Sequence, residues 1–365
     1  CPDCGEVNKA ECVFCNGCGA FRSESAAAPA AARGGRREAV YFGIVDLKYD
    51  GRRAPRERLR VLELGSGRTS RFSGCGEAVK REFEERYHIG QGACLNRAAL
   101  VDNKRVTHGV FAACGLGHLR PGQLCFPRVY RPDLADEIAL GLGCEAVDGT
   151  QEPAPVVLKL LNRCRGAGVV VFRPGKELDE GLRLLLSPPT EAPSAPPLEQ
   201  VLASDPSSLQ EQCLHWWANE CPVFVAERCE SSQPFCRGGR EYDGTMRVGF
   251  VLARAGEGED APLEAEFLGG YWKLPPQASG SAELRARVVS KASSGTAPVA
   301  EEDLAAAYGA LGPALPRVFA AERSSQTAMA AMYAGEPLLL SFVLAREAAE
   351  AAKESFRPQG GQDPG

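Results

Sequence analysis

Apolar residues recur along the chain in short runs whose spacing alternates between strand-like and helix-like. Runs rich in β-branched and aromatic residues predict strands, and apolar residues three or four positions apart predict amphipathic helices. The predicted strands span 39–49, 59–65, 156–161, 169–173, 223–229, 245–254 and 263–275. The predicted helices span 73–87, 176–186, 208–220, 303–315 and 343–353. This mixture predicts an α+β or α/β protein, with mixed sheets and flanking helices.

Three stretches interrupt the pattern and divide the chain. Residues 23–38 are rich in Ala, Gly, Pro and Arg without an apolar period, which predicts a flexible linker. Residues 187–205 begin with a Pro-rich run that predicts a long exposed loop, and residues 356–365 predict a disordered tail. The breaks leave a short first segment and a body in two parts: 1–22, 39–186 and 206–355.

The first segment contains two cysteine pairs with the spacing C-x2-C-x10-C-x2-C. Two thiolates separated by two residues bend onto one ion, and two such pairs complete the tetrahedral shell of a structural zinc site. A segment this short buries too little apolar surface to fold alone, so zinc binding would drive its folding. The predicted zinc ligands are Cys1, Cys4, Cys15 and Cys18.

The residues CPDCGEVNKAECVFCNGCGAFR resemble the zinc finger of the Ran-binding protein 2 type, and they are also similar to short zinc ribbons that end in FCxxCG. The finger resemblance implies a partner, either single-stranded RNA or ubiquitin. Readers of single strands stack bases on aromatic side chains beside arginine, and this segment offers only Phe14, Phe21 and Arg22. A protein partner or a purely structural role is therefore at least as well supported as RNA.

Overall composition narrows the class of protein. A net charge of -5 and a pI of about 5.7 argue against a generally basic nucleic-acid surface. An odd total of 15 cysteines together with a zinc site favours a reducing compartment, so the expected location is intracellular, in the cytoplasm or the nucleus. No apolar run approaches the length of a membrane span, and no contact with a membrane is expected.

A lysine and a glycine-containing loop form the first candidate site in the body. Lys159 lies near the end of the strand VVLKLL, and the following loop contains Arg165, Gly166 and Gly168 before the chain returns as VVVFR. A cation beside free backbone amides suits phosphate oxygens, and glycine permits their close approach. An ordinary hairpin with an edge lysine explains the same residues.

Three further residues lie on or beside predicted strands: Glu227 in VFVAERC, Arg247 in YDGTMR and Lys273 in GGYWKLPP. Together with the loop, this order over residues 39 to 330 resembles the ATP-grasp fold. The resemblance implies that Lys159 contacts the phosphates of ATP and that Glu227 lies in the hinge strand. It also implies that Arg247 holds phosphate or an acyl phosphate, and Arg247 and Lys273 are the candidate catalytic residues.

The resemblance departs from the family where magnesium is bound. The family places an Asn a short distance from a carboxylate, and this chain has Ser290 and Lys291 at the corresponding place in RVVSKASSGT. ATP and Mg²⁺ are the implied cofactors, but the missing ligand would deprive phosphoryl transfer of its main charge stabiliser. Glu264 and Glu266, which alternate along one strand, are the alternative metal ligands.

Three functions fit these observations. The first is an ATP-dependent carboxylate–amine ligase of the ATP-grasp type, with the finger recruiting its substrate. The second is a zinc-finger adaptor with a non-catalytic body. The third is a single-stranded RNA-binding protein, whose affinity would fall steeply with salt.

Overall fold

The computed structural model describes residues 37–66, 85–89, 103–145, 153–163, 166–187, 209–258, 260–280, 284 and 295–323. This part of the chain is an α+β protein with antiparallel sheets and flanking helices, which confirms the predicted fold class. The following predictions lie outside the described residues: the zinc ligands Cys1, Cys4, Cys15 and Cys18, the linker up to residue 36, most of the Pro-rich loop, the helix 343–353 and the tail.

A larger sheet has the strand order β12-β11-β10-β1-β2, and β3 pairs in parallel with the first residues of β1. All other pairings in this sheet are antiparallel. Its strands are β1 (Arg37–Tyr49), β2 (Leu59–Ser66), β3 (Tyr87–Ile89), β10 (Thr245–Arg254), β11 (Leu263–Leu274) and β12 (Gly295–Pro298). The four longest correspond to strands that the apolar pattern predicts.

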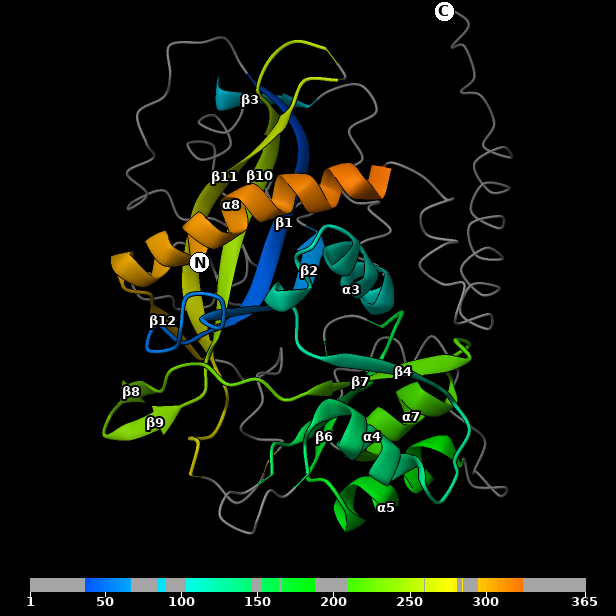
Figure 1. Ribbon diagram of the computed structural model, residues 1–365. Coiled ribbons are helices and arrows are strands. Elements are labelled where there is room, and N and C mark those ends of the chain that lie inside the picture. The colour runs from blue at the N-terminus through cyan, green and yellow to red at the C-terminus, as the bar shows by residue number, and fades with distance from the viewer. Residues whose placement is uncertain are drawn as a thin grey trace, which may run out of the picture.

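Helices cover one face of the larger sheet. These are α3 (Lys104–Ala113), the 3-10 helix η2 (Gly117–Leu119) and α8 (Glu301–Arg323), which lies across the strands in Figure 1. Val45 and Leu47 alternate along β1 and are fully buried against this layer. The neighbouring residues Asp46 and Lys48 consequently belong to the opposite face of the strand.

The helix predicted over 303–315 is longer in the structure, because α8 continues through Pro313 and Pro316 to Arg323. Proline lacks a backbone N–H and normally ends a helix. Here the residues around and beyond the prolines, Leu315, Val318 and Phe319, are buried in the main core. Burial of this apolar face offsets the missing backbone hydrogen bonds.

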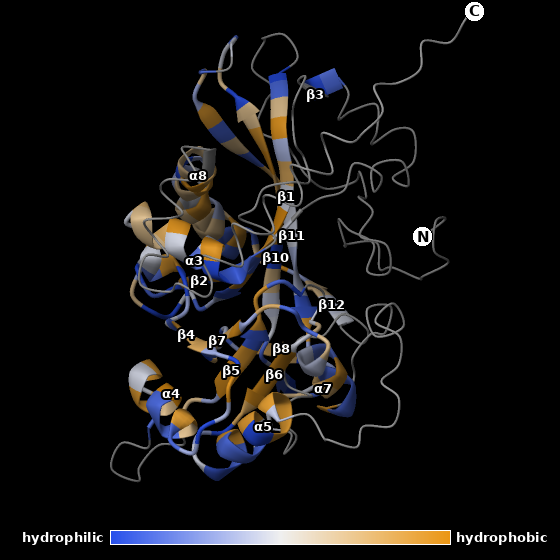
Figure 2. Cartoon of the chain, turned by 90° about the vertical axis from the view of Figure 1, so that its right-hand side faces the viewer, coloured by the Kyte–Doolittle hydropathy of each residue, from blue (hydrophilic) through white to orange (hydrophobic). Residues whose placement is uncertain are grey.

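A smaller sheet has the strand order β4-β7-β5-β6 and is antiparallel throughout. Its strands are β4 (Gln123–Pro127), β5 (Val156–Leu160), β6 (Val169–Phe172) and β7 (Val223–Arg228). Three helices pack against this sheet and form with it the second hydrophobic core of the protein. They are α4 (Leu134–Leu142), α5 (Lys176–Leu186) and α7 (Leu209–Trp217). Figure 2 shows hydrophobic and hydrophilic residues side by side on α4 and α5, as expected of amphipathic helices.

The two predicted parts of the body contribute strands to both sheets. The smaller sheet takes β4, β5 and β6 from the first part and β7 from the second, and the larger sheet mixes both parts in the same way. After β7 the chain forms a separate hairpin of β8 (Phe235–Arg237) and β9 (Arg240–Tyr242) before it enters β10.

One predicted element needs correction at its end. The pattern predicts a helix over 73–87, whereas the structure places Tyr87 in β3, paired with Arg37 of β1. The aromatic ring of Tyr87 is buried, and its hydroxyl donates to Glu266 on β11, so tertiary contacts decide the conformation. Within the described part of the chain, no helix combines the length and apolarity needed to cross a membrane.

Candidate functional site

A buried group of charges lies on the face of the smaller sheet that points away from its three helices. Lys159 on β5 and Glu227 on β7 form an ion pair, and Gln123 on β4 donates a hydrogen bond of 2.7 Å to the second oxygen of Glu227. The Glu227 side chain is only 2% exposed. The structure therefore brings together the lysine and the glutamate that the sequence predicts for the nucleotide site.

Arg120, which follows η2, completes this group. Its side chain is 1% exposed, with one guanidinium nitrogen 3.9 Å from Glu227 Oε1 and another donating to the backbone oxygen of Val61 on β2 at 2.8 Å. Burial by itself would raise the pKa of Glu227, but the charges of Lys159 and Arg120 outweigh burial and hold it below its usual value. Glu227 is consequently ionised at neutral pH.

The glycines after β5 serve packing and turn geometry. Gly166 and Gly168 have φ values of 82° and 71°, in the left-handed region that favours glycine. The amide of Gly168 donates to Gln212 Oε1 of α7 at 2.7 Å, and a Cβ at Gly168 would lie 2.5 Å from Leu160. The amide of Gly168 is thus already engaged within the protein, whereas Arg165 lies outside the described residues.

A second group of charges lies on the larger sheet, on the face opposite α8. Arg247 on β10 makes two hydrogen bonds of 2.6 Å to Asp46 on β1, one to each carboxylate oxygen. Strand register places Glu63 directly opposite Asp46, and Tyr271 directly opposite Arg247. Side chains of paired residues lie on the same face, so these four form one polar row across four strands.

The pKa values in this row reflect burial and pairing. Burial would raise the pKa of Asp46, but the charge and hydrogen bonds of Arg247 lower it below its usual value. Burial would likewise lower the pKa of Arg247, yet the Asp46 carboxylate raises it instead. Each group is therefore held in its charged form by the other.

Lys273 lies two residues after Tyr271 on β11, so it shares the polar face of Asp46 and Arg247. Within the described part of the chain, its ammonium group forms neither a hydrogen bond nor an ion pair. Burial, with the positive charge of Arg247, lowers the pKa of Lys273, while the carboxylates of Asp46 and Glu63 act in the opposite direction. Lys273 is thus a partly buried cation whose charge lacks a direct counterion in the described structure.

The two groups of charges are close enough to interact. Burial raises the pKa of the Cys229 thiol to about 11, while the charges of Lys48 on β1 and Lys159 on β5 both act to lower it. Lys104 at the start of α3 lies 3.7 Å from Glu63 on β2 and also donates to the backbone oxygen of Arg163 after β5. The Glu63 carboxylate, which acts to raise the pKa of both Arg120 and Lys273, links the two groups of charges.

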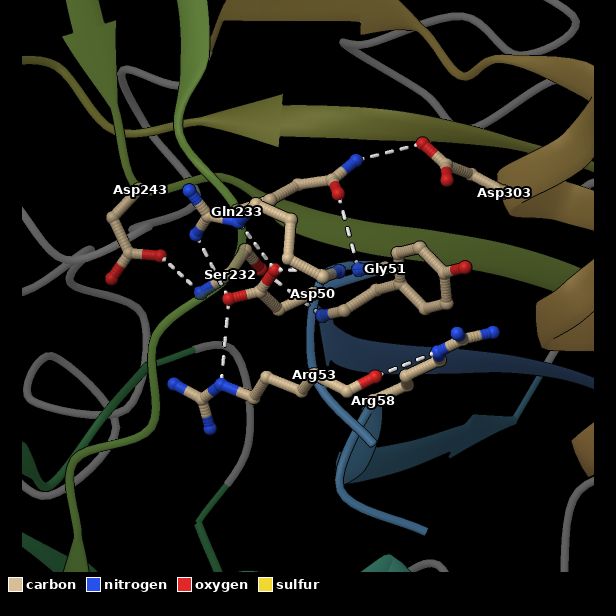
Figure 3. A network of polar contacts seen from close by, with 10 residues as sticks. Asp50, Gly51, Arg53, Arg58, Ser232, Gln233, Asp243 and Asp303 are labelled. Atoms are coloured by element: carbon tan, nitrogen blue, oxygen red, sulfur yellow. Dashed lines mark hydrogen bonds and ion pairs between the residues drawn. The ribbon is translucent and has the colours of Figure 1, made fainter. Parts of the chain in front are cut away.

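A polar network holds the chain where it passes from the smaller to the larger sheet (Figure 3). Gln233, between β7 and β8, accepts from the Gly51 amide at 3.1 Å and donates to Asp303 of α8 at 2.7 Å. The Ser232 amide donates to Asp243 at 2.8 Å. These contacts fasten the segment between β7 and β8 to the turn between β1 and β2, to α8 and to the loop before β10.

Asp50 lies in the turn between β1 and β2 and stabilises the turn itself. Its carboxylate accepts from the backbone amide and the guanidinium of Arg52 and lies 3.4 Å from Arg53. The hydrogen bond from the Arg52 side chain is the main cause that lowers the pKa of Asp50 to about 2. Asp50 is consequently ionised throughout the ordinary pH range.

The described carboxylates do not form a set of ligands for a magnesium ion. No group of three or more His, Cys, Asp or Glu side chains with metal-binding geometry occurs among the described residues. Glu266 is ion-paired with Arg37 and Arg86, and Glu264 with Arg37, so these alternative ligands are already neutralised. Ser290 and Lys291 lie outside the described residues.

The sequence patterns missed Asp46, Arg120 and Gln123. Asp46 is separated from Arg247 by 201 residues, and only the register of β1 against β10 shows that they pair. A charge between the apolar neighbours Val45 and Leu47 was the available signal. No protein-family model, curated protein or solved structure gives a significant match to this chain.

Proposed function

We propose that the described body binds a nucleoside triphosphate such as ATP where its two sheets meet. The observation that carries this proposal is Lys273, a partly buried ammonium group without a counterion among the described residues, on the same face as Arg247. A partly buried cation without a direct hydrogen-bonded counterion costs free energy, and the oxygens of a phosphate chain would supply that direct partner. The ATP-grasp resemblance also assigns Lys159 and Glu227 to the nucleotide, and these two residues form an ion pair on the smaller sheet.

In this proposal the body acts as a carboxylate–amine ligase. A carboxylate oxygen of the substrate attacks the γ-phosphorus of ATP, and the bond to the ADP oxygen breaks. The amine nitrogen of the second substrate then attacks the acyl carbon, releases inorganic phosphate and loses a proton to solvent. Arg247 and Lys273 stabilise the negative charge on the phosphoryl oxygens.

A thermal-unfolding titration of the full chain with ATP, with and without Mg²⁺, tests nucleotide binding. A ligand that binds only the folded state at 100 times its Kd adds about 2.7 kcal/mol of stability. We expect Lys273→Ala to lose most of the ATP-induced rise in unfolding temperature. Lys176→Ala is the matched control, because the Lys176 side chain is 89% exposed on α5. An unfolding temperature that ATP leaves unchanged in the wild type contradicts the proposal.

A second candidate function is non-catalytic nucleotide binding in an adaptor. Its specific support is the pairing of the site carboxylates: Glu227 is bound by Lys159 and Asp46 by Arg247, and the described residues form no cluster of acids. Catalysed phosphoryl transfer ordinarily depends on magnesium held by such acids. ADP production in the presence of Mg²⁺ and amine and carboxylate substrates supports the ligase, whereas ATP binding without turnover supports the adaptor.

In both candidates the first segment is a zinc module that recruits a protein or single-stranded RNA partner. Four thiolates, from Cys1, Cys4, Cys15 and Cys18, hold one structural Zn²⁺. Metal analysis of the purified chain is expected to give one zinc per molecule, and Cys15→Ser with Cys18→Ser is expected to remove it. Retention of zinc by that double variant would exclude the assigned ligands.

A further inference from the structure

The hairpin of β8 and β9 presents two arginines side by side. Arg237 and Arg240 are directly opposite each other in register and flank the turn residues Gly238 and Gly239. These glycines have φ values of 58° and 71°, as a tight two-residue hairpin turn requires. Like charges directly opposite each other destabilise a hairpin, so the arrangement has a cost that the hairpin alone does not explain.

Strand alternation places both arginines on the same face as the aromatic residues of the hairpin. Phe235 pairs with Tyr242 on that face, whereas Cys236 pairs with Glu241 on the other. The carboxylate of Glu241 consequently points away from the arginines. Within the described part of the chain, neither guanidinium forms a hydrogen bond or an ion pair.

The same two arginines line a pocket of about 440 Å³ at the end of β11. Its apolar surface includes Leu274 and Pro275, which are buried, and the half-buried ring of Tyr242. The lining is more polar than apolar, and the exposed Arg237 and Arg240 give it positive charge beside the smaller apolar surface. Its volume lies within the range of about 300 to 1,000 Å³ that is usual for small-ligand sites.

The segment after β11 and the start of β12 both lie against the hairpin. The Ser279 amide donates to the Glu241 backbone oxygen at 2.7 Å, which fastens the segment after β11 to the hairpin. Gly295 at the start of β12 faces Arg237, and a Cβ there would lie 3.3 Å from a guanidinium nitrogen. In Figure 1 the hairpin lies below β12, in agreement with these contacts.

We propose that this pocket is a second ligand site, which binds a small molecule that joins a carboxylate or phosphate group to an apolar body. The two guanidiniums form charge-assisted hydrogen bonds with the oxyanion. Leu274, Pro275 and Tyr242 contact the apolar part. None of the residues assigned to ATP lines this pocket. Binding of the small molecule is therefore tested independently of nucleotide binding.

Ligand-observed NMR titrations of the full chain test the proposal with three probes: benzoate, phenyl phosphate and uncharged benzyl alcohol. At least one of the two anions is expected to bind, and to bind at least about tenfold more tightly than benzyl alcohol, which corresponds to the loss of one good charge-assisted contact. The anion that binds more tightly identifies the oxyanion as a carboxylate or a phosphate. Absence of binding by both anions, or equal binding of benzyl alcohol, overturns the proposal.

Variants locate the binding. Arg237→Ala with Arg240→Ala is expected to weaken anion binding about tenfold or more. Arg131→Ala with Arg173→Ala is the matched control, because it removes the same net charge from two partly exposed arginines in the connecting segments of the smaller sheet. An equal loss in both double variants, or no loss in the first, overturns the assignment of the pocket. The folded state of each variant is checked by its unfolding temperature.

Discussion

Several groups contact Glu227 on the smaller sheet, whereas among the described residues Asp46 on the larger sheet forms an ion pair with Arg247 only. Lys159, Arg120 and Gln123 converge on Glu227, and each contact is buried. On the larger sheet, Arg247 takes both oxygens of Asp46, and Lys273 keeps a charge without a direct partner among the described residues. The first arrangement is suited to holding a fold together, and the second is suited to receiving an anion.

Removing the carboxylate of Glu227 is the strongest test of this difference. Glu227→Gln leaves Lys159 and Arg120 buried without a counterion, and breaking a buried pair in this way costs about 3 to 5 kcal/mol of unfolding free energy. Urea unfolding measures the loss. Glu177→Gln, at an ion pair whose carboxylate side chain is 44% exposed, is the control and should cost less than about 1 kcal/mol. Similar small losses in both variants would contradict a structural role for the Glu227 group.

Removing the charge of Asp46 should have a smaller effect. Asp46→Asn leaves Arg247 without its carboxylate, but the Arg247 side chain is 23% exposed and keeps access to water. We expect a loss of about 2 kcal/mol in urea unfolding, in line with a hydrogen bond to a charged group. The variant should also lower the pKa of Lys273 further, because the Asp46 carboxylate is the larger of the two charges that raise it. A loss of unfolding free energy larger than that of Glu227→Gln would contradict the assignment of the main structural role to the Glu227 group.

Neutralising Lys273 should increase stability. Lys273→Met keeps the volume of the side chain and removes a partly buried charge, so we expect a gain of about 1 kcal/mol in the absence of nucleotide. The same variant should lose the stabilisation that ATP confers on the wild type. A variant that is less stable than the wild type would show that Lys273 is already neutralised within the protein.

The contribution of Asp50, in the turn between β1 and β2, should be visible through pH. The pKa of Asp50 is about 2 in the folded protein and near 3.9 in an unfolded chain. A lowered folded-state pKa stabilises above the unfolded value, and this stability disappears as pH falls through about 2. The wild type should therefore be more stable than Asp50→Asn at pH 6, and the difference should vanish near pH 2. A difference that is unchanged at pH 2 would exclude the ionised Asp50 as its source.

The apolar pattern predicted the long strands and most helices, but it missed the elements between residues 88 and 155. Helix α3 contains the β-branched residues Val106 and Thr107 and has no acidic residue in its first turn, so local propensity gives a weak signal. Its start was marked by Asn103, whose side chain accepts from the amides of Arg105 and Val106. β4 is short and ends on Pro127, which also weakens its signal.

The candidate site was predictable only in part. Lys159 and Glu227 occur near the ends of well-marked strands, and the structure brings them into contact. Their buried neighbour Arg120 follows a short 3-10 helix, and no apolar period in the sequence predicts that helix. The engagement of Gly168 by Gln212 likewise depends on how α7 packs against β6, which local sequence does not encode. Long-range packing thus decides which predicted groups remain available to a ligand.

The most direct test of the proposed nucleotide site is the titration of Lys273 by NMR of a chain labelled with ¹³C at the lysine ε-carbons, with Lys273→Met identifying the signal. In the free protein, Lys273 should titrate below the usual lysine value, because burial and Arg247 disfavour its charge. Saturating ATP should raise the pKa of Lys273, because phosphate oxygens stabilise the ammonium form. A pKa of Lys273 that saturating ATP leaves unchanged would contradict the placement of the nucleotide phosphates beside Lys273 and Arg247.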